Sequence, residues 1–411
     1  MTNLDTSFDV TIIGAGPAGS LASALLNKMS HQVLVLERQH FPRFSIGESL
    51  LPQCMVLLER AGMLTAIENA GFQLKNGARF CRGDRQDSFD FSEKFSSGWD
   101  TTFQVQRDRF DEILADEAHR QGVEVRFGHT LTDFESMADR VRLEVEDECG
   151  KSYRLETRFV LDASGFGSVL PRLLDLEVAS GLAHRSSIFT HVKDHISDPE
   201  FDRNKILITV HPEFQDVWYW LIPFSNGRAS IGVIAADDRL KDMRGDSGHR
   251  LAALIAQERV MAGLLSNAEF DTRIGVVEGY SADVKQLFGK DFALLGNAGE
   301  FLDPVFSSGV TIALKSASLA ADVLDRQLRG LQPDWEREFA RPLKRGVDTF
   351  RVFVEAWYDG RLQDVIFASN KDENVKRMIC SILAGYAWDV ENPYVKNTDR
   401  INTLAELCRS R

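Results

Sequence analysis

A glycine-rich turn between a short apolar run and a helical pattern constrains the fold of this chain most strongly. The sequence GAGPAG, residues 14–19, follows the apolar residues 10–13 and opens a helical pattern at residues 18–28. Glycines there allow a tight bend, a close backbone approach to a pyrophosphate and close packing of helix on strand. The first N–H groups of the helix then face the phosphates. The pattern predicts a dinucleotide-binding turn, although a purely structural glycine turn has the same spacing. The residues assigned to it are Gly14, Gly16, Pro17, Ala18 and Gly19.

An acidic residue ends the next apolar segment, as a dinucleotide site requires. Residues 32–37 have strand character and finish at Glu37, 18 residues after Gly19. A carboxylate in that place accepts hydrogen bonds from the ribose hydroxyls of the adenosine. Pro17 in the turn, together with the lack of a second glycine motif for a nicotinamide cofactor, favours FAD over NAD. We assign Glu37 and its neighbour Arg38 to the cofactor-binding residues.

The composition disfavours several classes of protein. The 411 residues carry 48 basic and 61 acidic side chains, a formal charge of −13. Such a charge disfavours nonspecific binding to nucleic acid or anionic membranes. No apolar run approaches the roughly 20 residues that span a bilayer, and the residues from Met1 onward lack the basic start of a signal peptide. We expect a cytoplasmic protein with no membrane span and no nucleic-acid partner.

The cysteines and histidines indicate neither disulfides nor a metal site. The five cysteines are widely spaced and form no C-x-x-C pair. That usage is typical of reduced thiols in a cytosolic protein. The nine histidines show no metal-ligand spacing, so we predict no bound metal.

The patterns along the chain predict an α/β fold in three parts. Residues 108–120 have the periodicity of an amphipathic helix, and residues 292–295 read as a buried strand. Between about residues 186 and 236, successive short strand patterns indicate an antiparallel sheet. The predicted parts are residues 1–185 with 273–335 for a parallel-sheet FAD-binding domain, 186–272 for an inserted antiparallel sheet on the substrate side, and 336–411 for a C-terminal helical region. The aromatic residues of that region either pack its helices, which we favour, or line a substrate approach; they are Trp357, Tyr358, Tyr386, Trp388 and Tyr394.

Two tryptophans stand two residues apart in a strand pattern. Trp218 and Trp220 lie in the sequence VWYWLIP, residues 217–223. On an extended strand, residues i and i+2 point to the same face, and each indole covers roughly 150–250 Å². The pair therefore forms one bulky, rigid wall. Two core aromatic residues on a buried strand would show the same pattern.

Four further segments resemble the two-dinucleotide-fold flavoproteins related to aromatic hydroxylases. They are a V-x-R-x-x-F-D element at residues 105–111, a D-A-S-G turn at 162–165, a G-N-A element at 296–298 followed by a proline, and an I-G-E-S segment at 46–49. The resemblance implies that FAD is bound by Ile46, Gly47, Glu48, Ser49, Arg107, Asp162, Gly296, Asn297 and Pro304.

Three of these residues leave a question open. Asn297 stands where the family has an aspartate, and an amide still hydrogen-bonds a hydroxyl but brings no charge. On the residues alone, Arg107 also fits a solvated charge at a helix start. Glu48 also fits a capping carboxylate.

Three other elements resemble the flavin-dependent halogenases, in the short branch that acts on phenolic or pyrrolic substrates. Residues 218–223 match the W-x-W-x-I-P motif, and residues 301–309 match F-x-x-P-x-x-S-x-G. Lys75, in a K-x-G context, falls where these enzymes carry a catalytic lysine. Taken alone, such a lysine also fits an exposed solubilising residue. The resemblance extends over essentially the whole chain.

The halogenase resemblance implies a reaction and a division of roles. A separate reductase supplies FADH2, O2 converts it to a C4a-hydroperoxide, and chloride or bromide attacks to give hypohalous acid. Ser308 and Gly309 hold the halide on backbone N–H groups, a turn that also fits a plain serine N-cap. Lys75 directs the acid, because a buried ammonium donates a hydrogen bond and a desolvated amine is nucleophilic. The partition between flavin and substrate consists of Trp218, Trp220 and Pro223.

The substrate side departs from the tryptophan halogenases. Those enzymes have a glutamate directly before the serine that corresponds to Ser307, and this chain has Phe306. Free tryptophan is therefore not the expected substrate. A phenol or pyrrole, on an acyl or peptidyl carrier protein, needs that carboxylate less. Two other hypotheses stay open: an aromatic hydroxylase or prenyl-reductase-like oxidoreductase, and a flavin-binding protein without catalysis.

Overall fold

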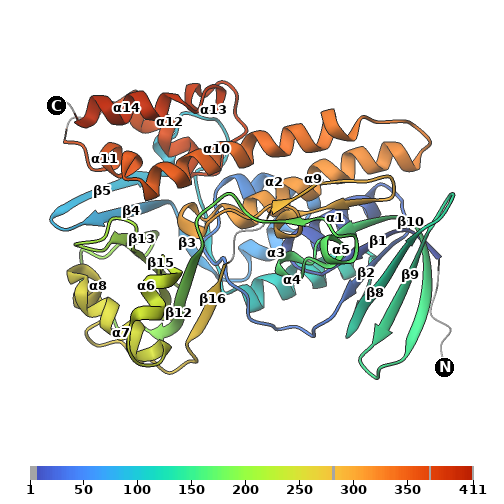
Figure 1. The fold of residues 1–411 in the computed structure, drawn as a ribbon, viewed down its shortest axis with the longest axis horizontal. Helices are drawn as coiled ribbons and strands as arrows, with labels where there is room; N and C mark the ends of the chain where they lie inside the picture. The colour runs from blue at the N-terminus through green and yellow to red at the C-terminus, as the bar shows by residue number, and fades with distance from the viewer. Residues whose placement is uncertain (1–6, 280–282, 370–371, 410–411) are drawn as a thin grey trace.

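The computed structural model of the chain contains two seven-stranded sheets, which lie on the left and the right of Figure 1 with helices between them. The structure describes residues 7–279, 283–369 and 372–409, so the predicted start of the chain at residues 1–6 lies outside the described residues. In the first sheet the strand order is β7-β2-β1-β10-β9-β8, and β18 pairs with β10. The strands β7, β2, β1, β10 and β18 are parallel, whereas β8, β9 and β10 pair antiparallel. Their bounds are β1 Ser7–Ile13, β2 Val33–Glu37, β7 Glu124–Phe127, β8 His129–Ser136, β9 Val141–Asp147, β10 Ser152–Asp162 and β18 Phe292–Leu294.

Side chains along β1 and β2 point alternately to the two faces of this sheet, and both faces are buried. Val10 and Ile12 belong to the core that includes the helices α1 (Pro17–Lys28), α4 (Arg107–Arg120) and α9 (Ser308–Leu328). Leu34 and Leu36 belong to a smaller core with residues of β8 and β9. Since successive side chains of a strand point to opposite faces, a strand buried on both sides reads as a continuous apolar run.

The glycine turn between β1 and α1 has the geometry that its sequence predicts. Gly14 has φ +92°, and a Cβ there would lie 2.7 Å from the carbonyl oxygen of Ala163. A Cβ on Gly19 would lie 1.9 Å from the carbonyl oxygen of Gly14. The loop thus closes on itself and on the end of β10, and no larger residue fits at either glycine.

The second sheet carries the tryptophans on its middle strand. Its order is β16-β12-β15-β14-β13-β4-β5, and only β13 and β4 pair parallel among these neighbours. Two of its strands come from residues 77–90 and one from 275–278, outside the range 186–272. The division into domains stays a prediction. The bounds are β4 Gly77–Arg82, β5 Arg85–Asp90, β12 Arg185–Lys193, β13 Lys205–Val210, β14 Trp218–Pro223, β15 Arg228–Ala236 and β16 Gly275–Glu278.

The two faces of the second sheet meet different partners. Tyr219 and Leu221 belong to a core with residues of the helices α6 (Asp237–Asp242), α7 (Ser247–Gln257) and α8 (Arg259–Leu264), which lie outside the sheet (Figure 1). Trp218 and Trp220 belong instead to the main core, with α1 and α9. The indoles therefore face the first sheet and its helices.

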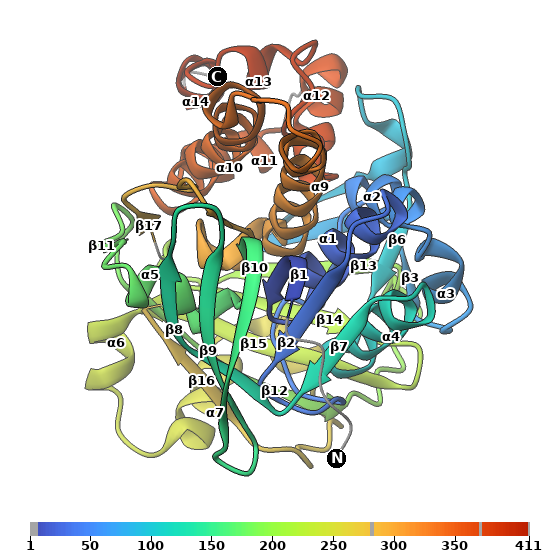
Figure 2. The ribbon, with the colours of Figure 1, turned by 90° about the vertical axis from the view of Figure 1, so that its right-hand side faces the viewer.

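The C-terminal helices stack beyond α9, in red above it in Figure 2. They are a π-helical turn at Glu336–Ala340, then α10 Arg341–Tyr358, α11 Arg361–Ile366, α12 Glu373–Leu383, α13 Pro393–Lys396 and α14 Arg400–Arg409. The remaining elements are α2 Gln53–Ala61, α3 Leu64–Glu68, α5 Val169–Leu173, the short strands β3 Gln73–Lys75, β6 Thr102–Gln104, β11 Glu177–Val178 and β17 Asp283–Val284, and four short 3-10 turns. Among the described residues, no helix is both long and apolar enough to cross a membrane.

The contact at Gly19 predicts a cost in stability. Gly19→Ala places a Cβ against a backbone oxygen, so the turn must move, and we expect the free energy of unfolding to fall by about 2 kcal/mol or more. Gly181→Ala is the matched control, because a Cβ there meets no atom within 4 Å. Urea unfolding followed by tryptophan fluorescence measures both. Equal midpoints for the two variants would contradict the close packing.

Candidate functional site

A cavity of about 330 Å³ lies where the two sheets meet the helix α9. Its lining comes from the β1–α1 turn, the loop 43–49, the start of β8, the turn after β10, the strands β12, β13, β14 and β16, and residues 295–313. Most of the residues predicted to bind the cofactor line it: Gly14, Gly16, Pro17, Ala18, Glu37, Arg38, Ile46, Gly47, Glu48, Ser49, Arg107, Gly296, Asn297 and Pro304. Gly19 and Asp162 are not among the lining residues.

Glu37 anchors the glycine turn and also faces the cavity. Its Oε2 accepts a hydrogen bond from the N–H of Ala15 at 2.9 Å, and its Oε1 accepts one from the N–H of Gln39 at 2.9 Å. The side chain is buried, with Arg43 Nη2 at 4.0 Å. A carboxylate has about four lone-pair positions, so it retains capacity for a ribose hydroxyl.

Arg107 holds the loop that carries the I-G-E-S segment. It makes a two-bonded contact to Asp111, with Nε at 2.7 Å and Nη2 at 2.9 Å, and Nη1 donates to the carbonyl oxygen of Ile46 at 2.5 Å. Arg43 lies 3.3 Å from the same carboxylate. Arg107 is buried and lines the cavity, so it is not a solvated helix-start charge.

The Asp162 side chain hydrogen-bonds to backbone N–H groups that follow β10. Its Oδ1 accepts from the N–H of Ser164 at 2.8 Å and its Oδ2 from the N–H of Leu170 at 2.6 Å. Burial raises the pKa of this carboxyl, against the opposing effect of the hydrogen bonds. The lining comes from residues 163–167 of the same turn. The side chain thus shapes the cavity wall, and its direct contact with FAD stays a prediction.

Trp218 and Trp220 both line the cavity. Their ring centroids are 6.0 Å apart and the planes are tilted by 49°. The Nε1 of Trp220 donates to Ser230 Oγ at 3.1 Å. Gly232, opposite on β15, makes room for this indole, because a Cβ there would lie 2.3 Å from the ring. Pro223 is buried at the end of the strand and is not a lining residue.

A hydrogen-bonded tyrosine ties this wall to the segment before α9. The Nε1 of Trp218 donates to Tyr358 Oη at 2.9 Å, and Tyr358 Oη donates to Asp303 Oδ2 at 2.7 Å. Asp303 Oδ1 in turn accepts from the N–H of Val305 at 3.0 Å. Burial and the charge of Asp303 raise the pKa of Tyr358 well above its usual value, so the hydroxyl stays a donor. The sequence favours helix packing over a substrate approach for Tyr358, and no local signal indicates its hydrogen bonds to Trp218 and Asp303.

The turn before α9 forms part of the cavity wall. Ser307 has φ +56° and ψ +26°, and its N–H donates to the carbonyl oxygen of Pro304 at 2.9 Å. The helix starts at Ser308, and the first N–H groups of a helix have no partner within it. Ser307 and Gly309 line the cavity, while Ser308 is buried beside them. Ser307 makes no side-chain capping bond to the helix, so a plain serine N-cap does not explain the turn.

Lys75 is buried and uncompensated by any carboxylate among the described residues. Only 1% of it is exposed, its Nζ donates to the carbonyl oxygen of Leu50 at 2.8 Å, and Nζ lies 5.4 Å from the centre of the Phe91 ring. Burial lowers its pKa to about 7, with the Cys54 thiol acting weakly in the opposite direction. The alternative of an exposed solubilising lysine is wrong. Lys75 is not among the residues that line the cavity.

Phe306 lies in the core, away from the cavity lining. It is buried and packs edge to face on Trp357, with ring centroids 6.2 Å apart. Its contact with a substrate stays a prediction. Sequence reasoning also missed Arg43 and His191; Arg43 lines the cavity and His191 bonds to Glu48, a lining residue.

The lining fits a flavin dinucleotide. Glycines at residues 14 and 16 let the backbone approach a pyrophosphate at the N-terminus of α1, and Arg38 and Arg43 add positive charge beside it. The indoles of Trp218 and Trp220 supply an apolar wall to the same cavity. In the described part of the chain, no group of three or more His, Cys, Asp or Glu is placed to hold a metal ion.

The fold and the cavity define a flavoprotein with a dinucleotide-binding parallel sheet. The family model described as the FAD binding domain matches residues 7–269. A solved structure described as a flavoprotein/dehydrogenase, from Cytophaga hutchinsonii, is 44% identical, covers 98% of this chain and 99% of its own, and superposes with a TM-score of 0.95.

Two relatives with assigned functions are halogenases. A 1H-pyrrole-2-carbonyl-[peptidyl-carrier protein] chlorinase of Pseudomonas fluorescens is 28% identical over 93% of this chain and 90% of its own length. A tryptophan 2-halogenase of Chondromyces crocatus is 30% identical over 77% of this chain, which covers 61% of that protein. The chain belongs to the FAD-binding domain family, and within it to the flavin-dependent halogenases.

The burial of Lys75 predicts a pH dependence of stability. Folding lowers the pKa of Lys75 from 10.5 to about 7, so between these values the unfolded chain binds more protons and rising pH favours the folded state. Relative to Lys75→Met, which cannot titrate, the wild type should therefore gain stability from pH 7 to pH 9, by up to about 1.4 kcal/mol per pH unit. Urea unfolding at each pH measures the difference. Lys151→Met, at an exposed site, is the control, and a flat difference for Lys75→Met would refute the shift.

Tyr358 should contribute to stability through its hydroxyl. Tyr358→Phe removes one hydrogen-bond partner from Trp218 and one from Asp303, at a cost of about 1–3 kcal/mol for buried polar groups. The control is Tyr394→Phe, a buried tyrosine whose hydroxyl bonds to no residue in the described ranges. Chemical denaturation and tryptophan emission follow both variants. If Tyr358→Phe is as stable as the control, the hydrogen bonds of the Tyr358 hydroxyl do not contribute to the free energy of unfolding.

Proposed function

We propose that this protein is an FADH2-dependent halogenase that makes hypohalous acid from chloride or bromide. The observation that carries the proposal is the shared cavity: the indoles of Trp218 and Trp220 and the turn at Ser307 and Gly309 line the same space as the dinucleotide-binding glycines. Reduced FAD, when bound, supplies the electrons that activate O2. The rest of the chemistry belongs to the residues of this chain.

The helix N-terminus would hold the halide. Backbone N–H groups at Ser308 and Gly309 open α9, and such groups favour an anion without the strong basicity of a lysine. The two indoles close the neighbouring side of the cavity. In this proposal they exclude an aromatic substrate, so that a halide rather than an organic ring meets the activated oxygen.

Lys75 would direct the hypohalous acid to the substrate. A pKa of about 7 leaves a mixture of ammonium and amine at neutral pH. The ammonium donates a hydrogen bond, and the amine is nucleophilic. Either form suits the capture or orientation of a small electrophile. The absence of a carboxylate at Phe306 favours a substrate that its own heteroatom activates, a phenol or a pyrrole.

The relatives support a carrier-bound substrate but leave other candidates in view. The chlorinase of Pseudomonas fluorescens is named for a pyrrole on a peptidyl carrier protein, and we propose an acyl or peptidyl carrier protein as a partner here. A separate flavin reductase would supply FADH2, and both partners would meet the enzyme in the cytoplasm. The 44% identical structure described as a flavoprotein/dehydrogenase favours a second candidate, a flavin oxidoreductase or hydroxylase that does not incorporate halide.

The variant Lys75→Ala tests whether halogenation of the substrate depends on Lys75 while oxidation of the flavin does not. We expect this variant to bind FAD and oxidise it with O2 at the wild-type rate, while halogenated product falls by roughly 100-fold or more. The assay supplies photoreduced FAD, O2 and bromide with phenol and pyrrole carrier-protein thioesters, and mass spectrometry counts incorporated bromine. Lys94→Ala is the control, a second buried lysine, whose ammonium lies 5.6 Å from the Tyr386 ring.

The same assay distinguishes the candidates. Oxidised product without halide from the wild type rejects the halogenase and favours a hydroxylase. Rapid NAD(P)H consumption without an added reductase points to a flavin oxidoreductase of another kind. A flavin that stays bound with no turnover at all favours a non-catalytic flavin-binding protein. A fully active Lys75→Ala removes Lys75 from the mechanism.

A further inference from the structure

A buried carboxylate–imidazole pair at the edge of the cavity has no chemical step in the function proposed above. Glu48, on the loop between β2 and α2, lines the cavity and is only 3% exposed. His191 lies on β12, and its Nε2 is 2.6 Å from Oε1 of Glu48. The imidazole side chain is 14% exposed. The pair therefore connects the cavity lining with solvent.

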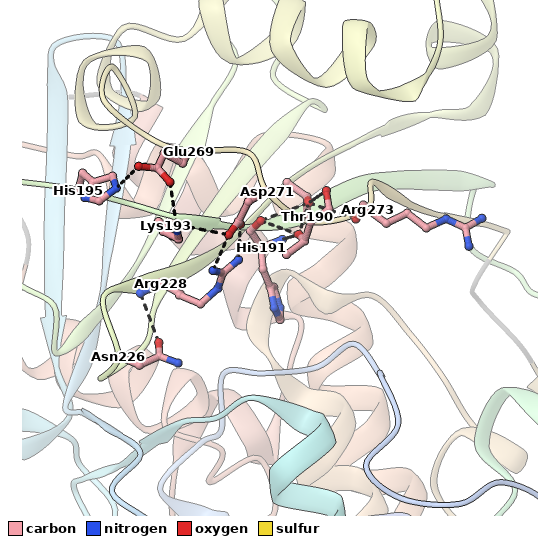
Figure 3. A network of polar contacts seen from close by, with 10 residues as sticks. Thr190, His191, Lys193, His195, Asn226, Arg228, Glu269, Asp271 and Arg273 are labelled. Atoms are coloured by element: carbon pink, nitrogen blue, oxygen red, sulfur yellow. Dashed lines mark hydrogen bonds and ion pairs between the residues drawn. The ribbon is translucent and has the colours of Figure 1, made fainter.

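The strand that carries His191 is firmly fixed. The His191 N–H donates to Thr272 Oγ1 at 3.2 Å, and that hydroxyl donates to the His191 carbonyl oxygen at 2.7 Å. Beyond it, Arg228 pairs with Asp271 at 2.6 Å, one of the exposed ion pairs in Figure 3. The figure shows the imidazole pointing away from that group of charges. The ring reaches Glu48 instead, with Phe44 and Phe224 packed against it at 5.7 and 5.3 Å.

The charged groups around His191 raise the pKa of its imidazole. Burial lowers its pKa, but the hydrogen bond and negative charge of Glu48, with a smaller contribution from Asp108, outweigh burial and the opposing charge of Arg228. The pKa of His191 therefore lies above its usual value. An imidazole of that kind exchanges a proton in the physiological range.

The proposed reaction needs a proton inside the cavity. One FADH2, one O2, one halide ion and one H⁺ give FAD, one hypohalous acid and one water. FADH2 and the halide each give up two electrons, and O2 takes all four. The oxygen that leaves as water thus requires a proton in each turnover, in a cavity from which the indoles and the helix α9 help to exclude solvent.

We propose that Glu48 and His191 form a relay that carries this proton from solvent to the cavity. The proposal rests on the halogenase function. His191 Nε2–H gives its proton to Glu48 Oε1, and the protonated carboxyl passes a proton to the departing oxygen in the cavity. The imidazole then takes a new proton from solvent through its partly exposed edge. Both residues return to their starting charge, and no other reactant is consumed.

His191→Gln tests the relay, because an amide can keep the hydrogen bond to Glu48 but cannot titrate. We expect FAD affinity to be unchanged. The rate of halide-dependent oxidation of bound FADH2 should fall roughly 100-fold at pH 8, and its pH dependence between pH 6 and 9 should flatten. The matched control is His40→Gln, which breaks an exposed histidine–glutamate pair of 2.9 Å outside the cavity lining and should leave rate and profile unchanged.

Two further measurements separate a relay from a structural contact. Added imidazole should restore oxidation in His191→Ala, because a free base can occupy the vacated space. In the protein without flavin, NMR titration of the histidine rings should show a pKa for His191 above that of ordinary histidines, and Glu48→Gln should lower it.

Specific results overturn the proposal. A His191→Gln protein that binds FAD and keeps the wild-type rate and pH profile removes the relay. The relay is also removed if His191→Ala binds FAD normally and oxidises it slowly, but added imidazole does not restore the rate. It is removed as well if Glu48→Gln leaves the pKa of His191 unchanged. Failure of the halogenase function shows separately, as a wild type that oxidises FADH2 without incorporating halide.

Discussion

The wall of indoles depends on one short chain of hydrogen bonds between three regions of the sequence. Trp218 comes from the second sheet, Tyr358 from the end of α10, and Asp303 from the segment that leads into α9. Asp303 also accepts from the N–H of Val305 and so helps to fix the turn that precedes the helix. A shift of the C-terminal helices would thus move both the indoles of the wall and the backbone amides at the start of α9.

Buried charge is the second constraint, and the chain treats it in two ways. Arg107 and Asp111 form a two-bonded pair that is closed from solvent, and the arginine uses its remaining donor on the loop at Ile46. Among the described residues, Lys75 meets a carbonyl oxygen and an aromatic face and forms no ion pair. Since an unpaired buried ion is costly, the molecule gives up stability at Lys75. Such a sacrifice is common at functional positions and rare elsewhere.

Sequence reasoning predicts the features whose physics is local. The glycine turn follows from steric limits within six residues, the wall from the two-residue period of a strand, and α4 from helical periodicity. Residues far apart in sequence bring the rest together. β4 pairs with β13 more than 120 residues away, and Glu48 meets His191 across 143 residues. Asp162 shows a different limit, because its motif is local but its two oxygens accept from the backbone N–H groups of Ser164 and of Leu170 in α5.

The strand ladder of the second sheet fixes a distance that side chains do not control. The chain passes from Lys75 directly into β4, which pairs with β13, and β13 pairs with β14, the strand of the indoles. Two interstrand steps amount to roughly 10 Å, and main-chain hydrogen bonds hold them. In the proposed mechanism, substitutions on the substrate side would therefore alter which ring is accepted without changing the distance that the hypohalous acid must travel. Under that proposal, selection for new substrates and selection for the transfer of the oxidant would act on separate parts of the molecule.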